Sequence, residues 1–433
     1  MTTSAPTSLT KPKVYESKTI QLTSPMLHIG SEVSKLNPFE YVQTASQVYL
    51  PNQEALAQAL QKQGGRFLQD YIEAIETQRP IENLLQQAFG ENWTKAKYLE
   101  EIPIFTNVLS KWMQQKNQQI TDLRPMIRNG MGQLYIPGSS IKGAIRTAIA
   151  YYLLKHADKY QVPSSHRVSQ IELKLREKLN AGELNSKWKQ KSVDDELFMN
   201  NLFANYSLLY QDKDRKTKSI QNTDILRAIH VSDSQPLLKH KIKNKKGIPV
   251  WHNVPIAAEV IVSSHFSDWR AKYKSPNYAE MVYNVRTEFT ITLDQEMLKW
   301  FRHRQGMKLP FQNLDELFNI CQEFAQAEWE SEVRYWENIV NNRHRGKYLN
   351  FDLVWEKFYA KPQCRYNLRL GWGSGMLGTT INCLFQEETR AELRDACGIA
   401  APNFEAPKSR RTIVNSKGEI GYVPGWVRFK LSR

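Results

Sequence analysis

Apolar and polar residues along the chain are spaced in ways that predict strands near both ends and helices between them. Residues 14–22 are predicted to form a first strand, which the Thr-Ser-Pro run at 23–25 closes. Residues 255–266 are rich in Val and Ile, and residues 283–293 alternate between apolar and polar side chains, so both are predicted as strands. Shorter strand-like runs occupy residues 225–231, 366–370, 412–414 and 425–431.

Apolar residues at helical spacing predict three main helical regions, and shorter helices are predicted within residues 160–192 and at 193–209. Residues 53–117, rich in Gln, Leu and Ala, are predicted as a helical insertion whose first helix breaks at the pair Gly64 and Gly65. A helix from residue 140 to about 157 buries one face, and a longer helix covers residues 313–342. Because strands and helices mix without regular βαβ alternation, the chain is predicted to be an α+β protein and not a doubly wound sheet.

Charge and aromatic content point to a polyanionic partner. The 433 residues include 59 Lys and Arg against 44 Asp and Glu, a net charge of +15. The 11 Trp and 19 Tyr supply flat rings on which the bases of single-stranded RNA can stack. Nucleic acid is therefore favoured over a membrane as the partner. The Lys-rich stretch 211–247 is predicted to form two mobile basic loops around the strand at 225–231, either as RNA contacts or as solvated loops without a ligand.

The sequence argues against a zinc-binding protein, a secreted protein and a membrane-spanning protein. The four cysteines, Cys321, Cys364, Cys383 and Cys397, form no CxxC pair and have no histidine placed to complete a zinc set. They predict reduced thiols in a cytoplasmic protein without metal or cofactor. Residues 1–13 lack an apolar core and are predicted as a disordered tail instead of a signal peptide. Apolar runs also stay short of the roughly 20 residues that a membrane span needs.

The sequence Y-I-P-G-S-S-I-K-G-A-I-R combines a turn with a basic helix start. Gly138 ends the turn, and Ser139 and Ser140 are candidate N-caps. Lys142 and Arg146 are four residues apart and share a face near the positive end of the helix dipole. Backbone amides, hydroxyls and two cations would then converge on one spot, which suits a ligand that carries phosphates. An ordinary helix start with a solvated Lys/Arg pair explains the same spacing.

A glycine-rich segment follows the strand predicted at 366–370. The run L-G-W-G-S-G-M-L-G at 370–378 contains GxGxxG, but only about 55 residues follow it, too few for the rest of a Rossmann domain. A backbone without Cβ atoms can approach a ligand closely and offer amides to phosphate oxygens. A phosphate-binding loop is therefore predicted at 371–378, with Trp372 either stacking on a base or packing in the core.

These motifs resemble those of the RAMP superfamily of CRISPR-associated proteins. A late glycine-rich loop after a strand is the hallmark of that superfamily, and the segment at 136–146 is similar to the signature of its type III members. Residues 22–31 resemble the first strand and turn of the same proteins. The closing segments at 407–412 and 425–430 resemble one subfamily, the fifth subunit of the type III-A Csm effector complex. The motifs occur in the family's order and cover both ends and the middle of the chain.

The resemblance implies tandem ferredoxin-like (RRM-type) RAMP domains with helical insertions. It divides the chain into an N-terminal domain at 14–270 and a C-terminal domain at 271–433. The first would carry the insertion at about 53–117 and the basic loops at about 211–247. The second would carry the long helix and the glycine-rich loop.

The resemblance also implies a non-catalytic role in antiviral defence. Members of this subfamily bind the crRNA, cap its 3′ portion and support assembly and crRNA maturation by nucleases recruited from outside, possible host exoribonucleases among them. The implied partners are crRNA, target RNA in the assembled ribonucleoprotein and the other Csm backbone subunits, which the insertion at 53–117 is predicted to contact. The residues expected at RNA are Gly138, Ser139, Ser140, Lys142, Arg146, Gly371, Trp372, Gly373, Ser374, Gly375, Lys408, Arg410 and Arg411.

The alternative is an endoribonuclease that processes precursor crRNA without a metal. Some RAMP proteins use a histidine near the end of the first strand as acid or base, and His28 lies in that region. His28 also lies between Leu27 and Ile29 in an apolar run, where a histidine usually has a structural role. The acidic runs at 194–196 and 387–388 are consecutive, so their side chains diverge and predict no metal site.

Overall fold

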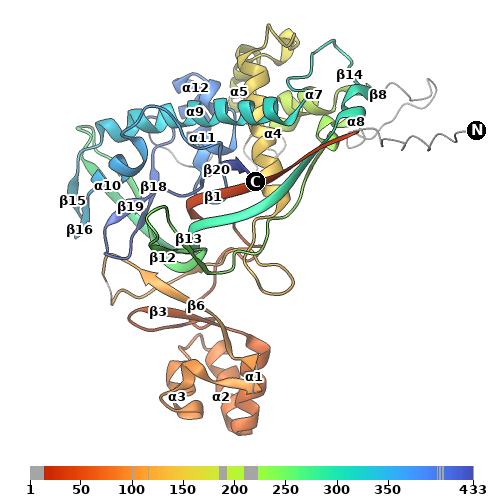
Figure 1. The fold of residues 1–433 in the computed structure, drawn as a ribbon. Helices are drawn as coiled ribbons and strands as arrows, with labels where there is room; N and C mark the ends of the chain where they lie inside the picture. Colours follow the sequence, from red (N-terminus) through yellow and green to blue (C-terminus); the bar gives the residue numbers. More distant parts are fainter. Residues whose placement is uncertain are drawn as a thin grey trace, which may run out of the picture.

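A computed structural model of the chain describes residues 14–99, 102–115, 117–184, 193–208, 223–396, 398, 401 and 404–432 (Figure 1). The tail predicted at 1–13 lies outside the described residues, as does most of the first predicted basic loop at 211–222. The described part is a mixed α/β structure built on one large mixed sheet.

The sheet is organised around three long strands, β1 (Tyr15–Leu27), β12 (Val254–His265) and β13 (Ala271–Asp294). One half of β13 pairs antiparallel with β12 and the other half with β1. In the described chain the sheet has twelve strands, and its main path runs β17-β20-β1-β13-β12-β6-β3-β2. The flanking strands are β2 (Val42–Gln43), β3 (Gln47–Pro51), β6 (Phe105–Trp112), β7 (Leu123–Arg124), β9 (Ile229–Val231), β17 (Leu368–Arg369), β18 (Arg410–Val414), β19 (Ile420–Tyr422) and β20 (Trp426–Leu431).

Two of the predicted strands are longer than their sequence patterns indicate. The first was expected to end at residues 23–25, but β1 continues to Leu27. Pro25 has no N–H to donate, yet Ser24 stays opposite Val285 and Met26 opposite Tyr283, so the pairing resumes beyond the proline. The strand predicted at 283–293 is only the second half of β13. The first half includes five consecutive buried residues, 278–282, and pairs on its second side at Tyr278 and Ala279, so it shows no alternation.

A layer of helices covers one face of the sheet, drawn above it in Figure 1. The layer contains α4 (Gly138–Lys155), α5 (Val168–Asn180), α9 (Leu314–Asn338), α11 (Gly375–Thr379) and α12 (Glu387–Ala396). The predicted apolar face of α4 is confirmed, since Ile141, Ile145 and Ile149 are buried against β1 and β13 side chains such as Leu22 and Phe289. The long helix is confirmed too, but it ends before residue 342 because Val340 forms a bridge with Arg270.

The helical insertion is real but shorter than predicted. Helices α1 (Gln53–Gln63), α2 (Gly65–Glu76) and α3 (Glu82–Phe89) form a lobe below the sheet in Figure 1, with its own apolar core. Gly64 separates α1 from α2, as predicted. The prediction of helix beyond residue 96 is wrong: β4 (Lys97–Leu99), β5 (Ile102–Pro103) and β6 follow, and β6 joins the main sheet through β3 and β12.

The prediction that the second basic stretch is an irregular loop is also wrong, because most of its lysines lie on a β-hairpin. Strands β10 (His240–Lys243) and β11 (Pro249–His252) pair antiparallel around a turn at 244–248. Only the last three residues of the strand predicted at 225–231 are β9, since Ile225–Ala228 is a 3-10 turn. The remaining short elements are α7 (Asn200–Ala204), β8 (Tyr206–Leu208), α8 (Gln295–Trp300), β14 (Phe301–His303), β15 (Asn342–His344), β16 (Lys347–Leu349) and α10 (Asp352–Val354).

Candidate nucleic-acid interface

The glycine-rich loop between β17 and α11 is held in place by close backbone contacts. Gly371 has φ +76°, and a Cβ atom there would lie 2.1 Å from the carbonyl oxygen of His28. Gly373 has φ +94°, and a Cβ there would lie 2.6 Å from the ring of Pro424. The amide of Trp372 donates to the same His28 carbonyl at 3.0 Å. Both glycines are therefore needed for the loop to sit against the end of β1 and the turn before β20.

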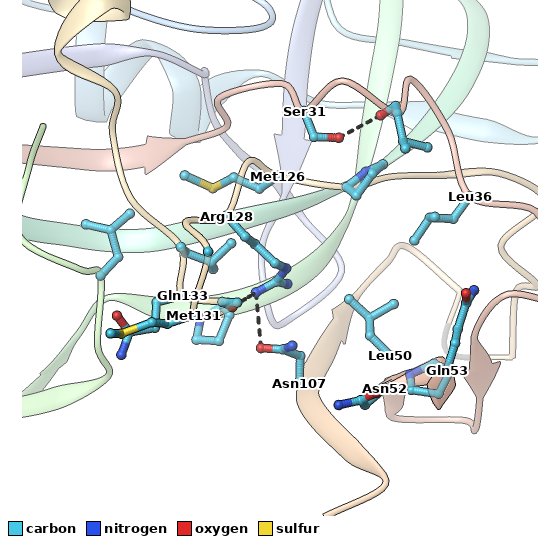
Figure 2. Close-up of a pocket in the computed structure, with 18 of the residues that line it drawn as sticks. Ser31, Leu36, Leu50, Asn52, Gln53, Asn107, Met126, Arg128, Met131 and Gln133 are labelled. Atoms are coloured by element: carbon cyan, nitrogen blue, oxygen red, sulfur yellow. Dashed lines mark hydrogen bonds between the residues drawn. The ribbon is translucent and has the colours of Figure 1, made fainter. Parts of the chain in front are cut away.

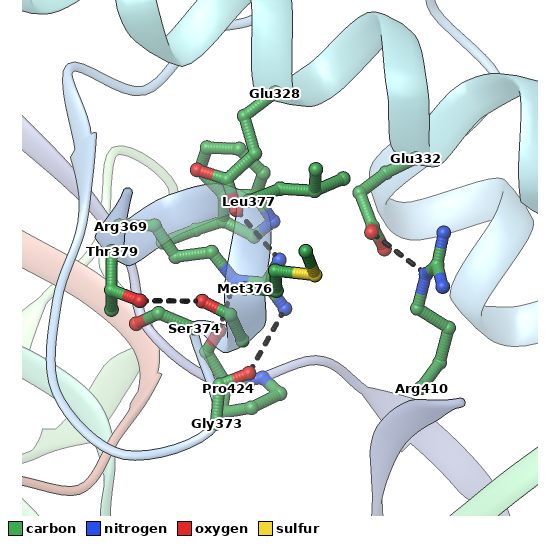
Figure 3. Close-up of polar contacts among 12 residues, drawn as sticks. Glu328, Glu332, Arg369, Gly373, Ser374, Met376, Leu377, Thr379, Arg410 and Pro424 are labelled. Atoms are coloured by element: carbon green, nitrogen blue, oxygen red, sulfur yellow. Dashed lines mark hydrogen bonds and ion pairs between the residues drawn. The ribbon is translucent and has the colours of Figure 1, made fainter. Parts of the chain in front are cut away.

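Two buried ion pairs connect α9 to β17, which leads into this loop, and to β18 (Figure 3). Arg369 Nη1 donates to Glu328 at 2.8 Å, and Arg369 Nε donates to the Pro424 carbonyl at 3.0 Å. Arg410 forms the second pair, with Glu332 at 2.8 Å. Burial raises the pKa of Glu328 to about 7, while the Arg369 guanidinium opposes that rise. These pairs hold β17 and β18 against α9. Breaking either pair would be costly, because it would leave a buried charge without a partner.

On its outer side the loop places Trp372 between two arginines. The guanidinium of Arg124, from β7, lies 5.2 Å from the Trp372 ring centroid, and that of Arg411, from β18, lies 5.1 Å from it. Within the described chain neither guanidinium has a carboxylate at ion-pair distance, and Arg411 Nε is buried without a hydrogen-bond acceptor. Burial and the nearby charges of Arg124 and Arg369 lower the pKa of Arg411. An anion at this position would supply the missing acceptor.

The predicted site residues of the glycine-rich segment are thus brought together with Arg411, but not with Arg410. Arg410 is 6% exposed and is directed at Glu332 and the ring of Tyr335, so RNA contact would require that pair to open. Ser374 is also buried, and its hydroxyl donates to the Gly371 carbonyl at 2.8 Å. Lys408 is half-buried, and its ammonium lies 5.0 Å from the Phe404 ring centroid.

The predicted phosphate site at the start of α4 is occupied by the protein's own groups. Pro137, and neither serine, is the N-cap residue, because the helix already begins at Gly138. The Gly138 amide donates to the Asp233 carboxylate at 2.8 Å, and a Cβ at Gly138 would lie 2.3 Å from the Val231 carbonyl oxygen. The prediction that Ser139 and Ser140 cap the helix is therefore wrong.

The two cations of the same motif are paired internally. Lys142 Nζ donates to the Ile229 carbonyl at 2.8 Å, and burial lowers its pKa. Arg146 forms an ion pair with Asp224 at 2.6 Å and covers the ring of Phe203. RNA contact by either residue would require the release of these partners, which hold α4 against β9 and the 3-10 turn before it.

His28 connects the first strand to the glycine-rich loop. The side chain is 2% exposed, and Nδ1 donates to the Glu280 carbonyl of β13 at 2.6 Å. Its ring meets the ring of Trp372 edge-on, with centroids 5.5 Å apart. Burial lowers the pKa of His28 to about 4, although the hydrogen bond to Glu280 acts in the opposite direction. A neutral, buried ring of this kind fits a structural role.

The basic hairpin presents an aromatic ring between lysines. Trp251 of β11 is 44% exposed, and the ammonium groups of Lys239 and Lys241 lie 4.6 and 4.4 Å from its ring centroid. His240 and His252 stack across the two strands with centroids 5.6 Å apart. Lysines with an exposed aromatic between them match the general needs of single-stranded RNA, a base-stacking surface and neighbouring positive charge.

A cleft with a volume of about 910 Å³ separates the helical lobe from the loop at 129–133 (Figure 2). Arg128 lines the inner wall of this cleft. It donates to Asn107 and to the Gly132 carbonyl, both at 3.1 Å, and pairs with the buried Glu280. Because these acceptors already satisfy Arg128, the cleft is a weaker candidate for a phosphate than the surface around Trp372.

The family assignment comes from comparison with known proteins. The family model of the RAMP superfamily matches residues 19–351. The chain belongs to the RAMP superfamily. No curated protein sequence matches it. The RAMP match contains β1, α4 and β13 but ends before the glycine-rich loop, so the loop's assignment depends on its own geometry.

Solved structures share the fold of this RAMP protein over nearly its whole length. One is a chain of a Csm–crRNA–target RNA ternary complex of a type III-A CRISPR–Cas system, with 21% identity, a TM-score of 0.54, and coverage of 96% of this chain and 100% of that chain. Another is Csm5 of T. onnurineus, with 18% identity, a TM-score of 0.53, and coverage of 95% and 100%. At these identities the likeness establishes the fold.

Two general features of this RAMP protein complete the description. In the described ranges, no group of three or more His, Cys, Asp or Glu side chains is arranged to hold a metal ion. The same ranges contain no helix with the length and apolar character to cross a bilayer.

Sequence reasoning missed Arg124 and Trp251 as candidate RNA contacts. Arg124 follows an ordinary apolar residue, and only the parallel pairing of β7 with β13 brings it to Trp372. Trp251 did carry a signal, since it stands beside His252 at the end of a Lys-rich run. That signal became specific only with the hairpin, which turns the ring toward Lys239 and Lys241.

Proposed function

We propose that this RAMP protein is the crRNA-binding subunit at the end of a type III-A Csm effector complex, in the role of Csm5. On this proposal it binds crRNA without cutting it, caps the 3′ portion and supports assembly and crRNA maturation. The pair of arginines around Trp372, without acidic partners in the described chain, carries the proposal, because it forms an anion site beside the glycine-rich loop.

The chemistry of this site suits a guide strand of any sequence. Arg124 and Arg411 offer N–H donors to phosphate oxygens, which carry no sequence information. The Trp372 ring is partly buried, meets His28 edge-on and is flanked by both guanidinium groups, so we assign it to orienting these cations and not to stacking on a base. A subunit that binds crRNAs of every spacer sequence requires contacts to the phosphates and not to the bases.

RNA binding by variants of the two arginines tests the proposal. Arg411→Ala and Arg124→Ala are each measured against unrelated single-stranded RNAs over a range of salt concentrations. Each is expected to weaken all RNAs alike and to reduce the slope of log K against log salt by about 0.7. Arg66→Ala is the control, since Arg66 is an exposed cation of the helical lobe. Unchanged affinity and slope in both arginine variants would refute the proposed function.

The endoribonuclease alternative depends on His28, and its burial argues against it. A general acid or base must reach the ribose and titrate near neutral pH, whereas His28 is buried and has a pKa of about 4. The test is incubation of repeat RNA with pure protein in EDTA. Cleavage that disappears in His28→Ala would favour the nuclease over the binding subunit.

The helical lobe suits contact with a protein and not with RNA. Residues 53–99 contain six Asp or Glu and five Lys or Arg, whereas the whole chain has a net charge of +15. We propose that this lobe contacts a neighbouring Csm subunit. Replacing residues 53–96 by a short linker should leave RNA affinity intact but reduce incorporation into a reconstituted complex.

The finer division into two ferredoxin-like RAMP domains remains part of this proposal. The boundary at 270 coincides with the turn between β12 and β13, and strands from both sides share the main sheet.

Supporting roles in crRNA maturation, with host exoribonucleases as candidate partners, are testable by the length of crRNA in complexes reconstituted with Arg411→Ala. Longer, heterogeneous 3′ ends are the expected result.

A further inference from the structure

We propose that the RNA strand held at Arg411 continues across β12 to a second cationic patch, formed by Lys272, Lys274, Arg345 and Lys408. The proposal rests on the proposed function, since it extends the path of the same ligand. The ligand it requires is the sugar-phosphate backbone of single-stranded RNA. Lys408 alone among these residues is predicted from sequence as an RNA contact.

Two of the lysines belong to the turn end of β13, and one of them, Lys272, shares the face that carries Arg411. Tyr273 packs with Trp336 in the core beside α9. Because side chains alternate along a strand, Lys272, opposite Ser264, points to the other face of the sheet, the face of Val262 and Arg411. Arg410 and Arg411 alternate in the same way, with Arg410 directed at α9 and Arg411 away from it. A β-bulge at Val262 leaves Lys274 without a partner residue on β12.

The patch contains closely spaced cations on aromatic supports. Lys408, Lys272 and Arg345 surround Lys274, and burial together with their charges lowers the pKa of Lys274. Lys272 Nζ lies 4.8 Å from the ring centroid of Phe266, which limits its freedom to move away. Mutual repulsion of this kind is relieved when an anion binds between the cations.

The acidic side chains on the surrounding elements face groups other than the patch cations. Asp268, in the turn between β12 and β13, pairs with Arg270 at 2.6 Å. Glu405 faces His265 at 3.7 Å, and Glu259 pairs with Lys347 at 2.8 Å. In the described residues, the four patch cations therefore share their surface with no carboxylate at ion-pair distance.

The sheet register places this patch next to Arg411. Arg411 lies opposite Val262 on β12, and Val262 lies opposite Ser275 on β13. Two strand spacings separate Arg411 from Ser275, about 10 Å, and Lys274 is the next residue. A separation of about 10 Å is short enough for one RNA strand to contact both sites with phosphates a few nucleotides apart or less. One continuous strand can therefore run from Trp372 across β12 to Lys274.

The test compares salt dependence in the full-length protein. Binding of an oligouridylate of about 12 nucleotides is measured for wild type, Arg411→Ala and Lys274→Ala/Lys408→Ala. The double variant is expected to lower the slope of log K against log salt by about 1.4, or 0.7 for each lost contact. Arg66→Ala/Lys95→Ala removes two exposed cations of the helical lobe and should keep the wild-type slope. Lys274→Gln/Lys408→Gln, which retains most of the apolar stems, replaces the alanine pair if that pair does not fold.

The outcomes separate this inference from the function on which it rests. A wild-type slope in the lysine variant, with a reduced slope in Arg411→Ala, would overturn the path over β12 alone and would favour an acidic protein segment as the patch's ligand. An unchanged slope in Arg411→Ala, together with an unchanged slope in Arg124→Ala, would contradict the proposed function itself. Reduced slopes in both, with wild-type behaviour in the lobe control, are the result that the structure leads us to expect.

Discussion

Arg410 and Arg411 are consecutive residues of β18 with opposite surroundings. Arg410 is buried and pairs with Glu332 of α9 at 2.8 Å. Arg411 lies on the other face, 5.1 Å from the centroid of the Trp372 ring, with its Nε lacking an acceptor. Strand alternation separates two identical side chains into a structural one and one that is available to a ligand.

Replacing these two arginines should therefore have different effects on stability. Arg410→Ala leaves Glu332 buried and unpaired, so the free energy of unfolding is expected to fall by about 3–5 kcal/mol. Arg411→Ala should change it by less than about 1 kcal/mol, because no ion pair is lost. Chemical denaturation of both variants gives these values. Arg176→Ala, which breaks a half-exposed pair with Glu392, provides the reference for an ordinary surface pair. Equal losses for Arg410 and Arg411 would contradict the assignment.

Gly371→Ala and Gly375→Ala form a matched pair that isolates the contact between the loop and β1. The two glycines have φ of +76° and +75°, so the backbone strain from a Cβ atom is the same, about 1–2 kcal/mol. Only at Gly371 would the new Cβ collide with the His28 carbonyl, whereas at Gly375 the space is open. We expect Gly371→Ala to lower the thermal midpoint further and to weaken RNA binding. Similar midpoints would show that the loop can shift away from β1 at little cost.

The buried His28 predicts a specific loss of stability at acidic pH. Its pKa is lowered from 6.5 to about 4, so below pH 6.5 the unfolded chain takes up a proton that the folded chain does not. Stability is therefore complete above pH 6.5 and falls by up to about 3 kcal/mol as the pH approaches 4. His28→Asn removes this contribution. The difference in unfolding free energy between wild type and variant should shrink between pH 7 and pH 4, and a constant difference would be inconsistent with a neutral His28.

Trp251 on the basic hairpin is expected to contribute a base-stacking surface. Trp251→Ala should reduce the affinity for single-stranded RNA by about 1–3 kcal/mol, the value typical of one stacked base. Its effect on stability should be small, because the ring is 44% exposed. Trp300→Ala, at a residue of similar exposure on α8, is the control. Affinity is measured by fluorescence anisotropy with labelled oligouridylate, and an equal loss in both variants would argue against a specific role for the hairpin.

Local features of this protein were readable from the sequence because they depend on residues close in the chain. The apolar face of α4, the length of α9 to within a few residues and the helix break at Gly64 follow from helical spacing and from glycine. The Val- and Ile-rich run of β12 and the glycine-rich loop after β17 also follow from local composition. The positive charge that favours a nucleic-acid partner is a property of the composition alone.

Tertiary structure decided which of the basic residues are free to meet that partner. Lys142, Arg146 and Arg410 look equivalent to Arg411 in the sequence, yet each of the three has an internal acceptor. Arg124 joins the site only through the pairing of β7 with β13. Spacing along the chain reports which face a side chain occupies within its own element. Whether that face meets a carboxylate or solvent depends on contacts between distant segments, such as Lys142 with Ile229, which are 87 residues apart, and those contacts form only when the sheet assembles.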